Sequence, residues 1–163
     1  MEALTTTGGD ILQLVTFTLG NEEYAVDILK VQEINRMTEV AKVPNSPAYV
    51  EGVINLRGRV IPVVNLRSRF GLGDKENDER SRIMIMDIQG LTIGVVVDSV
   101  SEVLRIPSNT VEPAPHMASE IGSEFIRGIA KLDDRLIILI DMDQIIDRPE
   151  RAGIVGSTKA IEY

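Results

Sequence analysis

The sequence contains no cysteine and only one histidine, His116. The absence of cysteine excludes disulfide bonds, thiolate nucleophiles and every metal centre held by sulfur. A single histidine cannot supply a metal site with two imidazole ligands, and no Gly-x-Ser-x-Gly nucleophile motif is present. We therefore predict that the protein has no catalytic residues, no metal site and no cofactor, and that His116 lies in an exposed loop.

Two acidic residues near the C-terminus resemble the start of a calcium-binding loop. Asp141 and Asp143 have the Asp-x-Asp spacing, but the glycine and the closing glutamate that such a loop needs downstream are missing. Carboxylates also stabilise the N-terminus of a helix, because they interact favourably with its dipole. We therefore expect these two residues to begin a short helix over residues 142–146.

The sequence also lacks clusters of basic residues and long apolar runs. Its formal net charge is −8 and only 4% of its residues are aromatic, so it is unsuited to binding a phosphate backbone or stacking on bases. The longest apolar runs, residues 95–97 and 137–140, are far too short to cross a bilayer. These features predict a protein that binds no nucleic acid and does not insert into a membrane. The absence of cysteine fits a reducing environment, so we expect the protein to be cytoplasmic.

The residues that are abundant favour β-structure. Hydrophobic residues make up 44% of the chain, and most of them are branched aliphatics, which favour strands. Apolar and polar residues alternate in segments that flank short turns, as in β-hairpins. The expected strand pairs are 12–19 with 23–28, 49–56 with 59–66, 83–88 with 91–97, and 125–131 with 135–140. Short helical segments are expected at 28–34, 66–72 and 98–103.

The two halves of the chain repeat one pattern. Offsets of 69 and 76 residues align positions of the first half with similar residues of the second. The aligned positions include Glu33 with Glu102, Ile34 with Val103, Gly52 with Gly128, and Arg59 with Arg135. We infer an internal duplication of a small β unit. Each unit is too small to bury its own apolar faces, so the two units should pack together and leave a groove between them.

The ends of the chain do not follow this pattern. Residues 1–11 are small and polar, and we expect them to form a flexible leader. Residues 149–163 contain proline, glycines and scattered charges without a period, and we expect them to form a tail. One domain would then span residues 12–148, with approximate halves at 12–80 and 81–148 that could exchange strands.

The most distinctive short segment is Asn55-Leu56-Arg57-Gly58, at the end of a predicted strand. Glycine permits a tight reversal there, and the corresponding turn of the second half keeps the leucine but not the arginine. Asn55 and Gly58 can be turn formers beside a solvated Arg57, or the arginine can serve in binding. Residues 28–34 are a second candidate, because their apolar side chains cannot all face one small core.

Longer segments resemble one known family, the CheW-type chemotaxis coupling proteins. The similar segments are residues 17–34 (FTLGNEEYAVDILKVQEI), residues 50–67 (VEGVINLRGRVIPVVNLR) after prolines at 44 and 47, residues 93–104 (IGVVVDSVSEVL), and EPAP at 112–115. They occur in the order found in the family and cover about residues 12–147. Asn65 departs from the family pattern, since an aspartate is frequent at that position.

The resemblance implies an all-β fold with short helices, built from two SH3-like five-stranded β-barrels related by a pseudo-two-fold axis. It also implies a non-catalytic adaptor that couples methyl-accepting chemotaxis receptors to the histidine kinase CheA in arrays at the membrane. The implied partners are the cytoplasmic tip of the receptors and the regulatory domain of the kinase. The implied receptor-binding residues, beside the groove between the barrels, are Val31, Glu33, Arg57 and Val103. The kinase-binding residues cannot be assigned from the sequence.

Two other hypotheses remain open at this point. A CheW-like regulatory module of a related array-based signalling pathway would have the same motifs. A β-barrel nucleic-acid-binding module would instead need basic strands with exposed aromatic side chains. The net charge of −8 and the low aromatic content argue against that second alternative.

Overall fold

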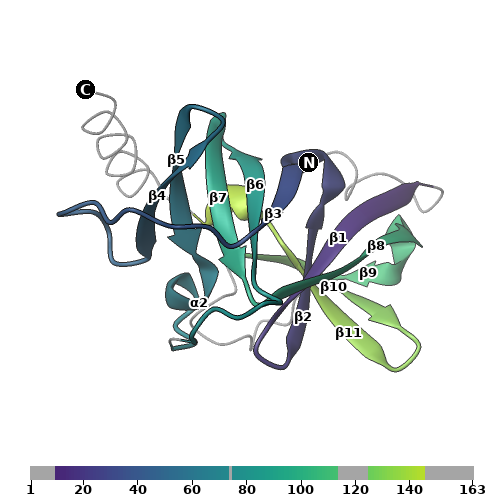
Figure 1. The fold of residues 1–163 in the computed structure, drawn as a ribbon. Coiled ribbons are helices and arrows are strands. Elements are labelled where there is room, and N and C mark those ends of the chain that lie inside the picture. Colours follow the sequence, from purple (N-terminus) through teal and green to yellow (C-terminus); the bar gives the residue numbers. More distant parts are fainter. Residues whose placement is uncertain (1–9, 74, 114–124, 146–163) are drawn as a thin grey trace.

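The computed structural model describes residues 10–73, 75–113 and 125–145, which form two β-sheets connected by short helical turns (Figure 1). The strands are β1 (Ile11–Leu19), β2 (Glu22–Asp27), β3 (Val31–Arg36), β4 (Val50–Leu56), β5 (Arg59–Asn65), β6 (Arg82–Ile88), β7 (Leu91–Val97), β8 (Ser99–Pro107), β9 (Val111–Glu112), β10 (Ile126–Leu132) and β11 (Arg135–Ile140). The helical turns are η1 (Ile28–Lys30), α2 (Leu66–Arg69), η2 (Ser108–Thr110) and η3 (Met142–Gln144). The predicted all-β fold with short helices is confirmed.

All four predicted hairpins are present as antiparallel pairs, namely β1–β2, β4–β5, β6–β7 and β10–β11. The β4–β5 turn shows why a two-residue connection works there. Both of its central residues have positive φ, 52° at Arg57 and 84° at Gly58, as a type I′ turn requires. The turn side chains that the sequence singled out therefore lie at the tip of a tight hairpin.

Each sheet takes strands from both halves of the chain. We call the six-stranded sheet, with the order β8-β1-β2-β11-β10-β9, sheet A, and the five-stranded sheet, with the order β3-β6-β7-β5-β4, sheet B. The hairpin β1–β2 belongs to sheet A, although β3, β4 and β5 of the same half belong to sheet B. The second half does the reverse, with β6–β7 in sheet B and β8 to β11 in sheet A.

The strand register supports the internal duplication at the level of single residue pairs. The parallel pair β2–β11 places Ala25 opposite Leu139, and the parallel pair β5–β7 places Gly94 opposite Val63. The offsets of 69 and 76 residues relate these two pairs to each other. The same offsets relate a register shift between Val50 and Gly52 on β4 to a shift between Ile126 and Gly128 on β10. The equivalent strands of the two sheets are therefore arranged in the same order and carry bulges at equivalent positions.

Two predicted helical segments are wrong. Residues 31–34 belong to strand β3, and residues 99–103 belong to strand β8. A three-residue spacing of apolar residues at 28, 31 and 34 suggested a helix, but only η1 is helical. Along β3 the side chains alternate between half-buried and exposed, and Ile34 is 39% exposed. The period of three thus arises from a helical turn followed by a strand that has one apolar residue on its outer face.

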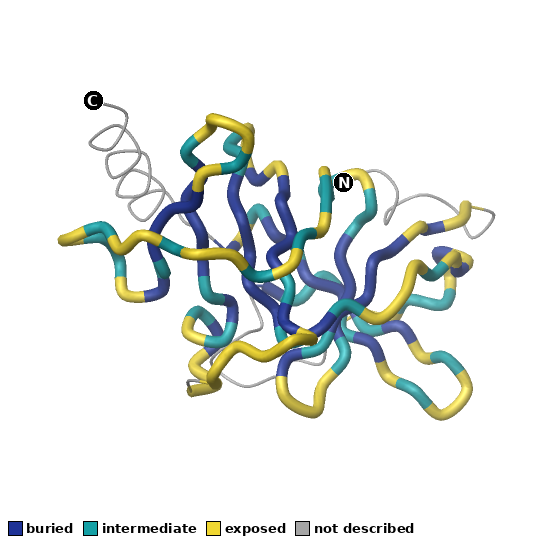
Figure 2. The backbone as a smooth tube through the Cα atoms, viewed as in Figure 1, coloured by how far each residue is buried: buried dark blue, intermediate teal, exposed yellow. Residues whose placement is uncertain are grey.

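The core consists of one large cluster and two smaller ones. The large cluster contains side chains of both sheets, among them Phe17, Tyr24, Phe70 and Phe125, whose rings follow one another at centroid distances of 5.5–5.8 Å. The smaller clusters each belong to one sheet. Figure 2 shows the buried segments running through the middle of both sheets. The two sheets therefore share a continuous apolar interior that fixes their relative position.

Candidate functional site

An ion pair between Glu33 and Arg57 joins two predicted site residues that are far apart in the sequence. Glu33 lies on β3, at one edge of sheet B, and Arg57 lies in the turn between β4 and β5, at the other edge. Arg57 Nη1 donates a hydrogen bond of 3.2 Å to Glu33 Oε1, and its Nη2 contacts Glu33 Oε2. The pair thus connects the two edges of one sheet, as expected where a sheet curls toward a closed barrel.

Three neighbouring residues determine how Arg57 is presented. The side-chain oxygen of Asn55 accepts a hydrogen bond of 2.9 Å from the backbone N–H of Gly58, across the turn. Leu56 is half-buried and packs against the sheet B core. The turn is therefore anchored from inside, while the Arg57 side chain is 70% exposed.

The electrostatics of the pair keep both groups charged. The hydrogen bonds from Arg57, followed by that from Asn35, hold the pKa of the Glu33 carboxyl below its usual value. The hydrogen bonds to Glu33 raise the pKa of the Arg57 guanidinium. Glu33 is the less exposed partner, with 28% of its side chain accessible. The arrangement therefore exposes the Arg57 guanidinium to solvent, while the Glu33 carboxylate fixes its position.

The structure does not gather all four predicted receptor-binding residues into one contact. Val31 lies on β3, and it is half-buried against the core that joins the two sheets. Val103 lies on β8, an edge strand of sheet A, where it is 55% exposed and opposite Val15 of β1. Both valines thus lie on edge strands, but of different sheets, and only Val103 offers a large apolar surface.

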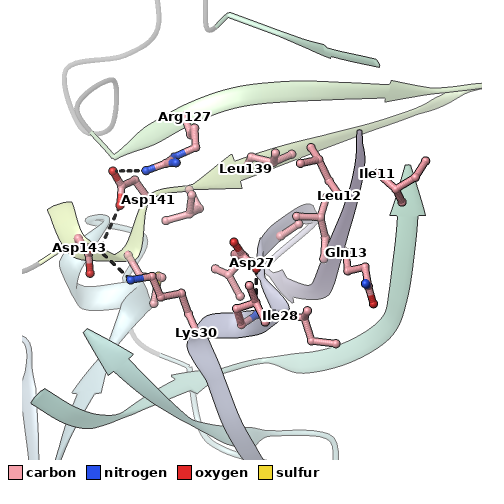
Figure 3. Close-up of a pocket in the computed structure, with 16 residues that line it drawn as sticks. Ile11, Leu12, Gln13, Asp27, Ile28, Lys30, Arg127, Leu139, Asp141 and Asp143 are labelled. Atoms are coloured by element: carbon pink, nitrogen blue, oxygen red, sulfur yellow. Dashed lines mark hydrogen bonds and ion pairs between the residues drawn. The ribbon is translucent and has the colours of Figure 1, made fainter. Parts of the chain in front are cut away.

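A pocket of about 300 Å³ opens beside η1 (Figure 3). Strands β1, β2 and β11 contribute apolar side chains such as Leu12 and Leu139 to its walls. At the rim, Lys30 pairs with Asp143 at 3.4 Å and Arg127 pairs with Asp141 at 2.7 Å. The predicted receptor-binding residues Val31, Glu33, Arg57 and Val103 do not line this pocket.

Leu29 is the most exposed large apolar residue at the mouth of this pocket, with 87% of its surface accessible. The repeat aligns Leu29 with Asp98, which pairs with Arg67 at 2.7 Å in the equivalent corner of the fold. The prediction from sequence placed residues 28–34 among the candidates without separating Leu29 from its neighbours. Aligning the two halves could have singled out Leu29, because this position holds a leucine in the first half and an aspartate in the second.

A second ion-pair cluster was not predicted from the sequence. Arg135, at the start of β11, donates hydrogen bonds of 3.1 and 2.6 Å to the carboxylate of Glu23 on β2. It also donates one of 2.9 Å to Glu102 on β8. The duplication aligned Glu33 with Glu102, and each of these glutamates pairs with an arginine in or beside the last hairpin turn of its own half of the chain.

No group of three or more potential metal-ligating side chains occurs in residues 10–73, 75–113 and 125–145. None of the helices in those ranges is long and apolar enough to span a membrane. The carboxylate of Asp141 accepts a hydrogen bond from the backbone N–H of Asp143 and so caps η3, as predicted. His116 lies outside the described residues.

Comparison with known proteins gives one consistent result. A family model described as "CheW-like domain" matches residues 13–150. The chain is 37% identical over 148 residues to a chemotaxis protein CheW of Klebsiella aerogenes, an alignment that covers 91% of this chain and 89% of that protein. It is 31% identical over 143 residues to the Bacillus subtilis protein of the same name, covering 88% of this chain and 92% of the relative.

A solved structure has the same fold. The crystal structure of the scaffolding protein TtCheW from Thermoanaerobacter tengcongensis superposes on this chain with a TM-score of 0.79 at 40% identity. The match covers 85% of this chain and 94% of the other. At this identity and coverage, the likeness extends over both sheets.

Proposed function

The chain belongs to the CheW-like domain family and is a non-catalytic chemotaxis scaffold protein, and on this basis we propose that it couples methyl-accepting chemotaxis receptors to the histidine kinase CheA. In this proposal it binds the cytoplasmic tip of the receptors and the regulatory domain of the kinase. It is a cytoplasmic protein that these contacts recruit to receptor arrays at the membrane. Val31, Glu33, Arg57 and Val103 are the proposed receptor-binding residues.

The observation that best supports this proposal is the presentation of Arg57. Its turn is anchored by Asn55 and Leu56, its guanidinium is held by Glu33, and most of its side chain still faces solvent. An exposed arginine on a rigid hairpin is well suited to a protein interface, because little conformational freedom is lost when a partner binds. A receptor tip formed by paired helices would offer carboxylates and apolar side chains to such a surface.

The mechanism requires no chemistry from the adaptor. It would hold the kinase and the receptor in a fixed relative position, so that a change in the receptor alters the conformational equilibrium of the kinase. Such coupling requires that the contacts differ in free energy between the two kinase states. The apolar interior shared by sheets A and B supports this role, because a stiff adaptor transmits a displacement that a loose one would absorb.

The experiment is an autophosphorylation assay of CheA in membranes that contain chemoreceptors. It compares no adaptor, the wild-type chain, Arg57→Ala and the matched control Arg59→Ala. Arg59 lies two residues further along the same hairpin and makes only a 3.4 Å contact with Thr92. We expect receptor control of the kinase with the wild type and with Arg59→Ala, and its loss with Arg57→Ala.

Two results would contradict the proposal in different ways. If the wild-type chain leaves kinase activity independent of the receptor ligand, although an established adaptor restores control in the same membranes, the coupling function is wrong. The chain would then serve a related array-based pathway. If Arg57→Ala behaves like Arg59→Ala, the coupling function stands and the assignment of Arg57 to the receptor surface is wrong.

A further inference from the structure

Strand β8 is an edge strand whose pairing with β1 is interrupted next to Val103. Thr16 lies opposite Glu102, but the next residue, Phe17, lies opposite Val100, so Ser101 is left over as a bulge. A bulge weakens the regular ladder and lets an edge strand bend. Residues of β8 near the bulge therefore need other contacts if their side chains are to keep one direction.

The main chain of Glu102 receives such a contact from a side chain. The fully buried hydroxyl of Thr16 accepts a hydrogen bond of 3.1 Å from the Glu102 N–H and donates one of 3.2 Å to the Glu102 carbonyl oxygen. This hydroxyl fixes the backbone of β8 at the bulge. It leaves the Glu102 side chain free to point across the sheet.

The side chain of Glu102 is held by Arg135. One nitrogen of the Arg135 guanidinium lies 2.9 Å from Glu102 and 2.6 Å from Glu23, and a second lies 3.1 Å from Glu23. Glu23 is on β2, which pairs in parallel with β11, the strand that begins at Arg135. The guanidinium thus ties the edge strand β8 to two inner strands, and planar arginine is well suited to bridging two carboxylates in this way.

The other half of the duplication lacks this arrangement. The position equivalent to Thr16 is Ile85, which has no hydroxyl, and the position equivalent to Glu23 is Thr92. Arg59, the counterpart of Arg135, reaches only Thr92 at 3.4 Å. Glu33, the counterpart of Glu102, pairs with Arg57 instead. The chain therefore contains its own comparison between an arginine that clamps an edge strand and an equivalent arginine that does not.

We propose that Arg135 is a positioning residue, which clamps β8 through Glu102 and so fixes the direction in which the neighbouring Val103 faces a bound partner. This inference rests on the proposed function, because Val103 matters here as a receptor contact. Arg135 itself touches no partner. Its removal would leave the carboxylates of Glu23 and Glu102 facing each other without the cation between them, and their mutual repulsion would push β8 outward at the bulge.

The test compares the wild-type chain with Arg135→Ala, Arg135→Lys and the control Arg59→Ala. Amide hydrogen exchange measures the protection of residues 99–105, and a titration with the cytoplasmic fragment of a chemoreceptor measures affinity. We expect Arg135→Ala to accelerate exchange in β8 and to weaken fragment binding, each by about tenfold. Arg135→Lys keeps the positive charge but replaces the planar guanidinium with a single ammonium group. Its exchange rate in β8 and its affinity for the fragment should therefore lie between those of the wild type and Arg135→Ala.

Each outcome decides one step of the inference. Exchange in β8 that is as slow in Arg135→Ala as in Arg59→Ala would show that no clamp exists. Faster exchange with unchanged affinity would show that the clamp does not position the partner surface. If the wild-type chain binds no receptor fragment, the proposed receptor contact fails. The exchange measurement would still decide whether Arg135 holds β8, and unfolding curves of all variants would exclude a global loss of structure.

Discussion

Replacing Gly52 by alanine is the sharpest test of how the hairpin that presents Arg57 is built. Gly52 lies at the bulge of β4 with φ of 149°, a conformation that residues with a side chain rarely adopt. A Cβ atom at this position would lie 2.1 Å from the carbonyl oxygen of Ala41. That oxygen accepts a hydrogen bond of 2.8 Å from Val53, and Ala41 donates an equal one in return. The substitution must therefore displace residue 41 and break this bridge.

The expected loss of stability follows from these contacts. Two backbone hydrogen bonds contribute about 1 kcal/mol each, and the strained φ adds about 1–2 kcal/mol. Gly52→Ala should therefore lower the free energy of unfolding by about 3–4 kcal/mol. For a chain of this length, each kcal/mol shifts Tm by about 2–4 °C, which gives a decrease of about 6–16 °C.

The assay is thermal and urea unfolding followed by circular dichroism, with Gly90→Ala as the control. Gly90 has φ of 81°, also unfavourable for alanine, but no atom lies within 4 Å of its added Cβ. Gly90→Ala should therefore lower the free energy of unfolding only by the cost of the strained φ, about 1–2 kcal/mol. If the two variants are equally stable, the clash with Ala41 is not real and the bridge does not anchor β4.

Two further predictions concern the pair and the core. Arg57 lowers the pKa of Glu33, so the pair is present above the usual glutamate range and is lost as the pH falls through the lowered pKa. An NMR titration should therefore place the Glu33 midpoint below that of an exposed glutamate, and Arg57→Ala should raise it; an unchanged midpoint in the variant would contradict the pairing. Phe70→Ala removes a buried ring between Tyr24 and Phe125. It should cost about 3–5 kcal/mol in urea unfolding, and a loss below 1 kcal/mol would show that the shared core does not depend on this ring.

Much of the fold could be predicted from the sequence, because hairpins have local signals. The turn residues and the period-two alternation located all four hairpins, and the repeat gave the correspondence between the two halves. The edge strands β3 and β8 were mistaken for helices because their signal is not local. Val31 follows directly on a helical turn, and Ile34 points outward, so the apolar spacing imitated a helix. Pairing with β6, which lies about fifty residues further along the chain, is what makes this segment a strand.

The candidate site could be predicted only in part. The distinctive turn drew attention to Arg57, and the resemblance to a family drew attention to Glu33, but their pairing depends on two sheet edges meeting in space. The cluster around Arg135 was invisible for the same reason, since its three members come from β2, β8 and β11. Sequence indicates which residue types are unusual, whereas the partners of a charge are decided by tertiary structure.

The exchange of hairpins between the two sheets resembles the strand exchange that is seen in some dimers. A single ancestral unit with the strand placements of β1 to β5 would have its first hairpin and its last three strands in different sheets. It could complete either sheet only by borrowing strands from a second copy of itself. The present chain has the geometry of such a strand-exchanged dimer joined end to end. The two halves are nevertheless not equivalent, because Arg59 contacts only Thr92 whereas its counterpart Arg135 pairs with Glu23 and Glu102.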